Sequence, residues 1–236
     1  FLYNDQDTKT IFNAYLNADG RPQAECDNKT RKNYGVSANY GSVKQYFKDM
    51  SYGAYTPQFD VYGPVHLSQN MAYYGNNGNN RMHLFIPDVC DKAYKELGVD
   101  FSEYDSDGDN KVDLVYVIFA GYSGSISGTS DDCIWPKTGT EYAGPYNGVT
   151  VNRYSVANEL NGNPQATTKY GYMINGIGLF CHEFSHAMGL PDFYSTNNAT
   201  QTDNQGMEDW SLLDGGEYVH NGYYPTAYTA WEREAM

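Results

Sequence analysis

Basic residues are scarce in this 236-residue sequence, which carries 15 Lys and Arg against 29 Asp and Glu. The resulting net charge of −14 repels nucleic acids and anionic membrane surfaces, so it argues against both as partners. Long apolar runs are also missing, because no stretch approaches the ~20 residues that cross a bilayer, and we expect no membrane insertion. Hydrophobic residues make up 40% of the chain, which is enough for a core of respectable size.

Cysteines are few as well, and none of the four belongs to a Cys-x-x-Cys pair, which disfavours a structural zinc knuckle. Cys26, Cys90, Cys133 and Cys181 could form two disulfides by three connectivities in an oxidising compartment. Buried free thiols are the alternative, and the spacing does not choose between them.

A signal-peptide pattern is also absent, and the chain opens on Phe1-Leu2-Tyr3-Asn4. We therefore expect that any targeting segment has been removed. At the other end, a predicted helix within 223–236 stops in mid-pattern at Met236. We expect a longer polypeptide to continue beyond this residue.

What the sequence does contain is the stretch His182-Glu183-Phe184-Ser185-His186-Ala187-Met188-Gly189-Leu190-Pro191-Asp192. Histidines four apart on a helix lie one turn apart on the same face, so both imidazoles can bind one metal ion. Glu183 can reach a water on that metal. Gly189 suits a helix end, and Leu190-Pro191 brings Asp192 back as a third ligand. Two imidazoles and one carboxylate leave a fourth tetrahedral position open, as in a catalytic zinc site.

The competing interpretation is a buried amphipathic helix whose histidines are hydrogen-bonded in the core. A bare His-Glu-x-x-His arises by chance in ~0.5% of chains of this size. The Gly and Asp at their fixed offsets lower that frequency by more than about a hundredfold. The pattern therefore favours zinc.

Hydrophobic periodicity predicts secondary structure elsewhere in the chain. Helices are expected within 43–50, capped by Ser42, within 81–97, with Pro87 as a kink or a later start, and within 171–190. Strands are expected within 55–67, 112–120 and 148–160, whereas residues 1–41 are polar and weakly patterned.

Residues 105–113 form an acidic loop with carboxylates at positions one, three, five and nine, and the seventh residue can offer its carbonyl. The candidate calcium ligands are Asp105, Asp107, Asp109, Lys111 and Asp113. Asn110 occupies the position that needs a left-handed backbone, but Tyr116 replaces the bidentate Glu at position twelve. A solvated acidic turn is the competing interpretation.

The sequence resembles the M6 family of secreted bacterial metallopeptidases, the immune inhibitor A type. The motif of residues 182–192 has the His-Glu-x-x-His-x-x-Gly-Leu-Pro-Asp form of that family. The similarity covers roughly residues 35–234 and extends to residues 41–47, 51–53, 60–67, 73–75, 100–113, 120–121, 134–136, 207–216 and Pro225.

The resemblance implies an α+β, metzincin-like zinc peptidase with a twisted mixed sheet, a backing helix, an active-site helix and a smaller, mostly irregular C-terminal part. Residues 1–236 would form a single catalytic domain, with an upper part of about 1–190 and a lower part of about 191–236 meeting at a cleft. Zinc would be held by His182, His186 and Asp192, with Glu183 as the general base.

Two positions depart from the family pattern. Metzincins place a methionine beneath the zinc, where this sequence has Leu213, whose side chain can fill the same apolar volume. Lys137 stands where the family has His after Trp-Pro. Tyr218 is the candidate second oxyanion donor, from its position after that turn.

The function implied is a secreted or cell-surface bacterial zinc endopeptidase that acts on protein or peptide substrates, with calcium as a structural cofactor. The alternative is a catalytically inactive module that holds zinc, or a calcium-stabilised adhesion module. Glu183 argues against an inactive zinc-holding module, because a pure binding site needs no base at that position. A calcium-stabilised adhesion module would leave the zinc-binding pattern unexplained.

Overall fold

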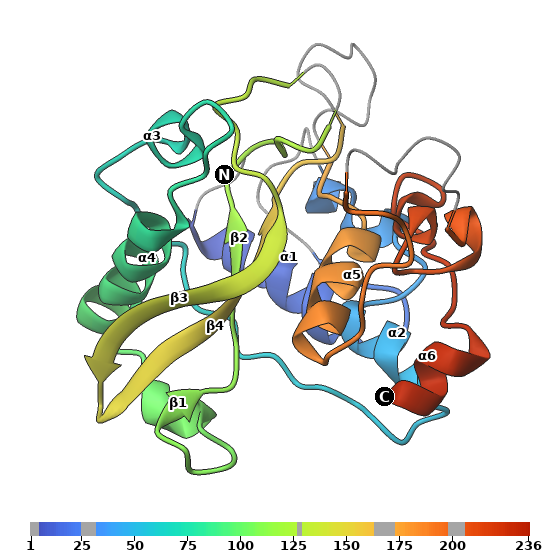
Figure 1. Ribbon diagram of the computed structural model, residues 1–236, viewed down its shortest axis with the longest axis horizontal. Coiled ribbons are helices and arrows are strands. Elements are labelled where there is room, and N and C mark those ends of the chain that lie inside the picture. Colours follow the sequence, from blue (N-terminus) through green and yellow to red (C-terminus); the bar gives the residue numbers. More distant parts are fainter. Residues whose placement is uncertain (1–4, 25–31, 127–128, 163–172, 198–205) are drawn as a thin grey trace. The chain divides into compact units, whose positions relative to one another are not determined.

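The computed structural model describes residues 5–24, 32–126, 129–162, 173–197 and 206–236, and Figure 1 traces its elements. The α-helices are α1 (Asp5–Asn17), α2 (Val43–Met50), α3 (Met71–Gly75), α4 (Met82–Leu97), α5 (Ile177–Ala187) and α6 (Ala230–Ala235). The strands are β1 (Lys111–Val112), β2 (Val115–Phe119), β3 (Lys137–Tyr146) and β4 (Val149–Asn158). The 3-10 helices are η1 (Lys32–Ala38), η2 (Phe101–Tyr104), η5 (Glu208–Trp210) and η6 (Gly215–Tyr218).

The chain divides into two compact units, which we call the sheet unit and the helix unit. The sheet unit comprises Phe1–Asp5 and Tyr62–Gly171, and the helix unit comprises Gln6–Val61 and Tyr172–Met236. The expected single catalytic domain, with an upper and a lower part, stays a prediction.

The sheet unit is built on a long antiparallel pair formed by β3 and β4, which Figure 1 shows as two adjoining arrows. β1 and β2 both pair with β4 in the parallel sense. Their registers, Lys111↔Thr150 and Val115↔Tyr154, have the same offset along β4. The predicted α+β class and the mixed sheet are therefore confirmed.

The strand expected over 112–120 is interrupted, which corrects the prediction of one continuous strand. Asp113 donates its backbone N–H to the carbonyl of Tyr104 at 2.8 Å, and its Oδ1 accepts from the Ser106 N–H at 3.4 Å. Because Asp113 is held by the loop before it, its N–H is not available to the sheet. Pairing with β4 resumes at Val115.

Helix α4 packs against β3, and Figure 1 shows the helix beside this strand. Its buried residues Phe85, Ile86 and Cys90 join a core that also contains Tyr146 and Val151 of the sheet. The helix begins at Met82 and continues through Pro87, so the later start that Pro87 allowed is wrong. Gly98 ends it with φ 67°, a conformation that glycine adopts without steric cost.

The helix unit has an aromatic core between α2 and α5. Ser42 caps α2 as predicted, because its Oγ accepts the Gln45 N–H at 3.0 Å. Phe47 of α2 meets Phe184 of α5 edge-on with ring centroids 5.1 Å apart. This contact anchors the helix that carries the zinc motif.

The strand expected over 55–67 is wrong, because none of these residues belongs to a strand. Pro57 and Pro64 lack the N–H that a ladder requires. At Phe59 the side chain of Asn17 takes the place of a neighbouring strand, since its amide donates to the Phe59 carbonyl at 2.8 Å and accepts from the Phe59 N–H at 2.9 Å.

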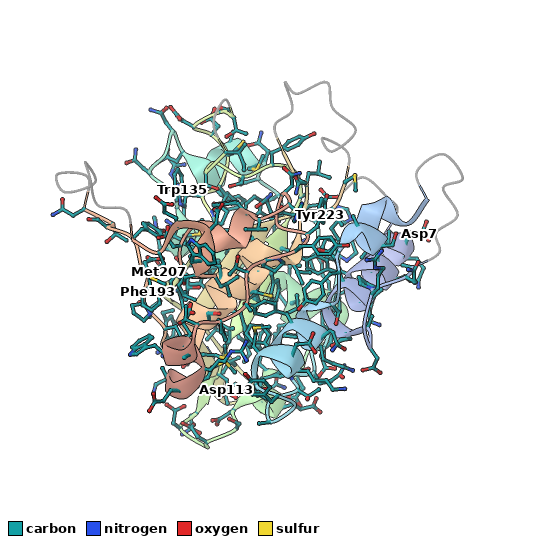
Figure 2. The ribbon with its side chains drawn as sticks, turned by 90° about the vertical axis from the view of Figure 1, so that its right-hand side faces the viewer. Asp7, Asp113, Trp135, Phe193, Met207 and Tyr223 are labelled. Atoms are coloured by element: carbon teal, nitrogen blue, oxygen red, sulfur yellow. The ribbon has the colours of Figure 1, made fainter. Side chains whose placement is uncertain are left out.

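After α5 the described residues form only short helices. The helix expected from about Pro225 begins later, at Ala230, because Thr229 and Glu232 form a reciprocal capping box that fixes its first turn. Met207 and Phe193 lie near one another in Figure 2, and the backbone of Gly206 passes so close to the Phe193 carbonyl that a Cβ would lie 1.6 Å from it.

Three of the four cysteines lie in the described ranges, and Cys90, Cys133 and Cys181 are free thiols. The structure thus favours unpaired cysteines over two disulfides, while Cys26 lies outside the described residues. Burial raises the pKa of the Cys181 thiol well above its usual range, so this neighbour of His182 is a neutral core residue. None of the helices in these ranges combines the length and apolar composition that a bilayer-spanning segment needs.

Candidate metal centre

Helix α5 brings His182 and His186 to one face, where their rings meet edge-on with centroids 4.6 Å apart. The helix ends at Ala187 with Met188 as its C-cap, and Gly189 then turns the chain with φ 100°. The carbonyl of Leu190 then accepts from Nδ1 of His186 at 2.8 Å. This return of the chain places Asp192 beside both histidines.

The candidate ligand atoms converge within the helix unit. Nε2 of His182 and Nε2 of His186 are 3.0 Å apart, and Oδ1 of Asp192 lies 3.4 Å from the first and 3.1 Å from the second. Tetrahedral zinc with bonds of about 2.0–2.1 Å places its ligand atoms about 3.3 Å from one another. The three spacings fit one zinc ion.

The hydrogen bonds of the rings indicate which nitrogens face the ion. Nδ1 of His182 lies 2.9 Å from the carbonyl of Leu212, and Nδ1 of His186 lies 2.8 Å from that of Leu190. A carbonyl only accepts, so in the neutral rings both Nδ1 atoms carry the proton and both Nε2 atoms present lone pairs. Oδ1 of Asp192 is buried without a hydrogen-bond partner. Two lone pairs and a carboxylate oxygen facing one point form a cation site.

Carboxylates dominate the electrostatics of this site. Burial lowers the pKa of His182, but Glu217, Asp192 and Glu183 outweigh it and raise this pKa to about 9. Burial raises the pKa of Asp192, but the adjacent imidazoles of His182 and His186 outweigh it and hold this pKa well below its usual range. The negative field that favours a charged imidazole also favours a bound cation.

Glu183 is buried, with 6% of its surface exposed, and its charge acts on His182. Its assignment as general base stays a prediction. Leu213, at the expected methionine position, is fully buried, and the preceding residue Leu212 supplies the carbonyl to His182.

Sequence reasoning missed two residues beside the candidate ligands. Burial and the nearby negative charge of Asp192 raise the pKa of Tyr194 well above its usual range. Glu217 is buried, and its Oε2 lies 3.8 Å from Nδ1 of His182. Tyr194 follows the motif by two residues and could have been singled out, whereas Glu217 has no motif of its own.

Tyr218, the candidate oxyanion donor, is about half exposed at 49%. Its side chain hydrogen-bonds to Glu217, which partly offsets the burial that raises the pKa of that carboxyl to about 7. A role for Tyr218 toward a substrate oxygen stays a prediction.

The acidic loop of the sheet unit brings together Asp105, Asp107 and Asp109, whose oxygens lie within 4.8 Å of one another. Asn110 has the predicted left-handed backbone, with φ 64°. Asp113 is not one of this group, and Lys111 directs its Nζ to Asp109 at 2.5 Å. The loop geometry thus brings together three of the four candidate carboxylates, and calcium binding by the loop stays a prediction.

Comparison with known families decides the assignment of the chain. Residues 28–236 match the family described as immune inhibitor A peptidase M6, catalytic domain. The chain belongs to the M6 peptidase family. The resemblance seen in its motifs is therefore confirmed, and membership of this metallopeptidase family implies a bound metal.

Curated M6-type relatives include the pre-pro-metalloprotease PrtV of Vibrio cholerae serotype O1, which is 25% identical over 224 residues. That alignment covers 84% of this chain and 24% of the relative. Immune inhibitor A of Bacillus thuringiensis subsp. alesti is 26% identical over 229 residues, covering 82% of this chain and 31% of the relative. The chain thus spans between about a quarter and a third of the length of these relatives.

Proposed function

We propose that this chain is a zinc-dependent endopeptidase domain of the M6 family, with His182, His186 and Asp192 as ligands and Glu183 as general base. The observation that carries the proposal is the convergence of the Nε2 atoms of His182 and His186 and the unpartnered Oδ1 of Asp192 at 3.0–3.4 Å from one another. Membership of a peptidase family supplies the substrate class, which is protein or peptide.

The site residues divide the chemistry among them. A zinc ion, when bound, acidifies a water molecule and polarises the carbonyl of the peptide bond to be cleaved. Glu183 takes the proton of the attacking water and passes it to the amine that leaves. Leu212 and Leu190 hold the two rings through Nδ1, so that the Nε2 atoms keep their lone pairs for the ion.

The finer parts of the assignment belong to the same proposal. We infer a metzincin-like arrangement in which Leu213 replaces the methionine beneath the metal, because its buried side chain fills a similar apolar volume. A secreted bacterial enzyme would also suit the two bacterial relatives, although the chain covers only part of each.

The proposal is tested by incubating the purified chain with unfolded casein in the presence and absence of a chelator. We expect hydrolysis that the chelator abolishes and that added zinc restores. Hydrolysis that persists after the metal has been removed would contradict a zinc peptidase. A chain that binds zinc and leaves casein intact would instead indicate the inactive binding module.

We also propose that the acidic loop is a weak structural calcium site. Its carboxylates repel one another, and a bound ion would turn this repulsion into stabilisation that grows as RT ln(1 + [L]/Kd). Because Tyr116 replaces the bidentate Glu, we expect a Kd of ~10⁻⁴–10⁻³ M.

Millimolar calcium should therefore raise the melting temperature of the native chain, and Asp107→Ala should abolish the rise without removing zinc. Asp49→Ala removes an exposed carboxylate of the helix unit and serves as the control that keeps the rise. If native and Asp107→Ala chains both melt at temperatures independent of calcium, the loop is a solvated turn.

A further inference from the structure

A buried carboxylate without a motif lies beside the candidate metal centre. Glu217, on η6, has 5% of its surface exposed, and its Oε2 has no hydrogen-bond partner. This oxygen lies 3.8 Å from Nδ1 of His182, on the side of the ring that faces away from the ligand atoms. Within the described part of the chain, no lysine or arginine comes within salt-bridge distance of Glu217.

Two glycines allow Glu217 to lie beside His182: Gly178 in the first turn of α5 and Gly176 just before this helix. Gly178 lies one turn before His182 on the same face of the helix, and a Cβ there would meet the Glu217 carbonyl at 2.0 Å. At Gly176, before the helix, a Cβ would meet the backbone of Gly222 at 2.1 Å. The chain around η6 can thus approach α5 only because these positions lack side chains.

The charge balance of the candidate metal centre indicates a role for the Glu217 carboxylate. The three ligands, two neutral imidazoles and one carboxylate, compensate half the charge of a divalent cation, and the buried Glu183, which is not a ligand, is the next nearby negative charge. Glu217 supplies a further negative charge behind His182, where it also favours the ring that carries its proton on Nδ1.

We propose that Glu217 is a positioning residue that strengthens zinc binding through His182, by adding negative charge behind the ring and by favouring the form that carries its proton on Nδ1. The inference rests on the proposed zinc site. The oxygen at 3.8 Å is beyond direct hydrogen-bond distance, so its effect is mainly electrostatic while the Leu212 carbonyl accepts the proton of Nδ1.

The test measures the zinc dissociation constant by competition with a chromophoric chelator, together with the melting temperature of each metal-free protein. Glu217→Gln removes the charge and keeps the shape, and we expect zinc binding to weaken by about 10–100-fold. Glu217→Asp keeps the charge, and its affinity should lie nearer to that of the native chain.

Glu232→Gln is the matched control, because Glu232 is a fully buried carboxylate of the same unit that bonds to Ser211 and Thr229 rather than to the metal centre. It should lower the melting temperature of the metal-free protein and leave the zinc affinity unchanged. A purely structural role for Glu217 would produce this same pattern in Glu217→Gln.

An affinity of Glu217→Gln within twofold of the native value, or an equal loss in Glu217→Asp, overturns the inference and leaves the zinc site standing. A native chain that binds no zinc overturns the proposed function instead. If Glu217→Gln folds only in the presence of metal, the zinc concentration at which each variant folds is measured in place of the dissociation constant. The inference is overturned if Glu217→Gln needs no more zinc to fold than Glu217→Asp does.

Discussion

Replacing Glu183 with Gln is expected to lower peptide hydrolysis by about 10²–10⁴-fold while the zinc content of the protein stays the same. Glu183 stands next to His182 in the sequence but is not one of the three atoms that converge, so its loss leaves the ligands in place. Gln keeps the shape of the side chain and cannot accept the proton of the attacking water. Initial rates on casein and metal analysis of the same preparation check the two halves of this expectation.

The comparison needs a variant in which another buried carboxylate becomes an amide. Glu232→Gln serves, since it alters a helix cap of the same unit and should keep hydrolysis within a few-fold of the native rate at temperatures where it is folded. Near-native activity of Glu183→Gln would mean that another group activates the water, and the assigned role of Glu183 would be wrong.

His186→Ala should reduce bound zinc from about one equivalent to near none, because two ligands hold a catalytic zinc far less well than three. Its Nε2 lies within 3.1 Å of both other ligand atoms, so its removal opens the centre. Hydrolysis should disappear together with the metal. Metal analysis after dialysis against a weak chelator measures the change.

His220→Ala is the control for this variant, because His220 is an exposed histidine of the same unit. It should retain zinc and activity. One zinc per chain in dialysed His186→Ala would show that the ion is held elsewhere, and the ligand assignment would fail.

The local sequence pattern predicted the part of the candidate metal centre that is formed by one turn of helix α5 and the loop that follows it. The spacing of His182 and His186 fixes their common face, and Gly189 takes the left-handed conformation that returns Asp192 to them. Helix α2 and its cap at Ser42 were equally local, and both were predicted.

Elements that depend on distant partners were predicted less well. Residues 55–67 alternate like a strand, but their backbone bonds to a side chain, Asn17, that no periodicity reveals. Helix α1 lies in a segment too polar to show a strong pattern, although Ile11, Phe12 and Tyr15 are buried. Its burial arises from packing with residues far along the sequence, such as the bond from Tyr15 to the Gly176 carbonyl at 3.0 Å.

Glu217 shows the same limit within the site itself. It lies 35 positions after His182 in the sequence, and only the absence of a side chain at Gly178 allows its backbone to approach α5. A lone glutamate after two glycines has no spacing that indicates a metal centre. Its relation to His182 therefore became visible only from the packing.

The most direct test of the central claim is the zinc X-ray absorption spectrum of the purified chain, recorded on a preparation whose metal content has been measured. We predict one zinc per chain, with a first shell of nitrogen and oxygen at about 2.0–2.1 Å and outer-shell scattering from two imidazoles. A sulfur shell at about 2.3 Å would place the ion on cysteines instead, and would contradict a centre formed by His182, His186 and Asp192.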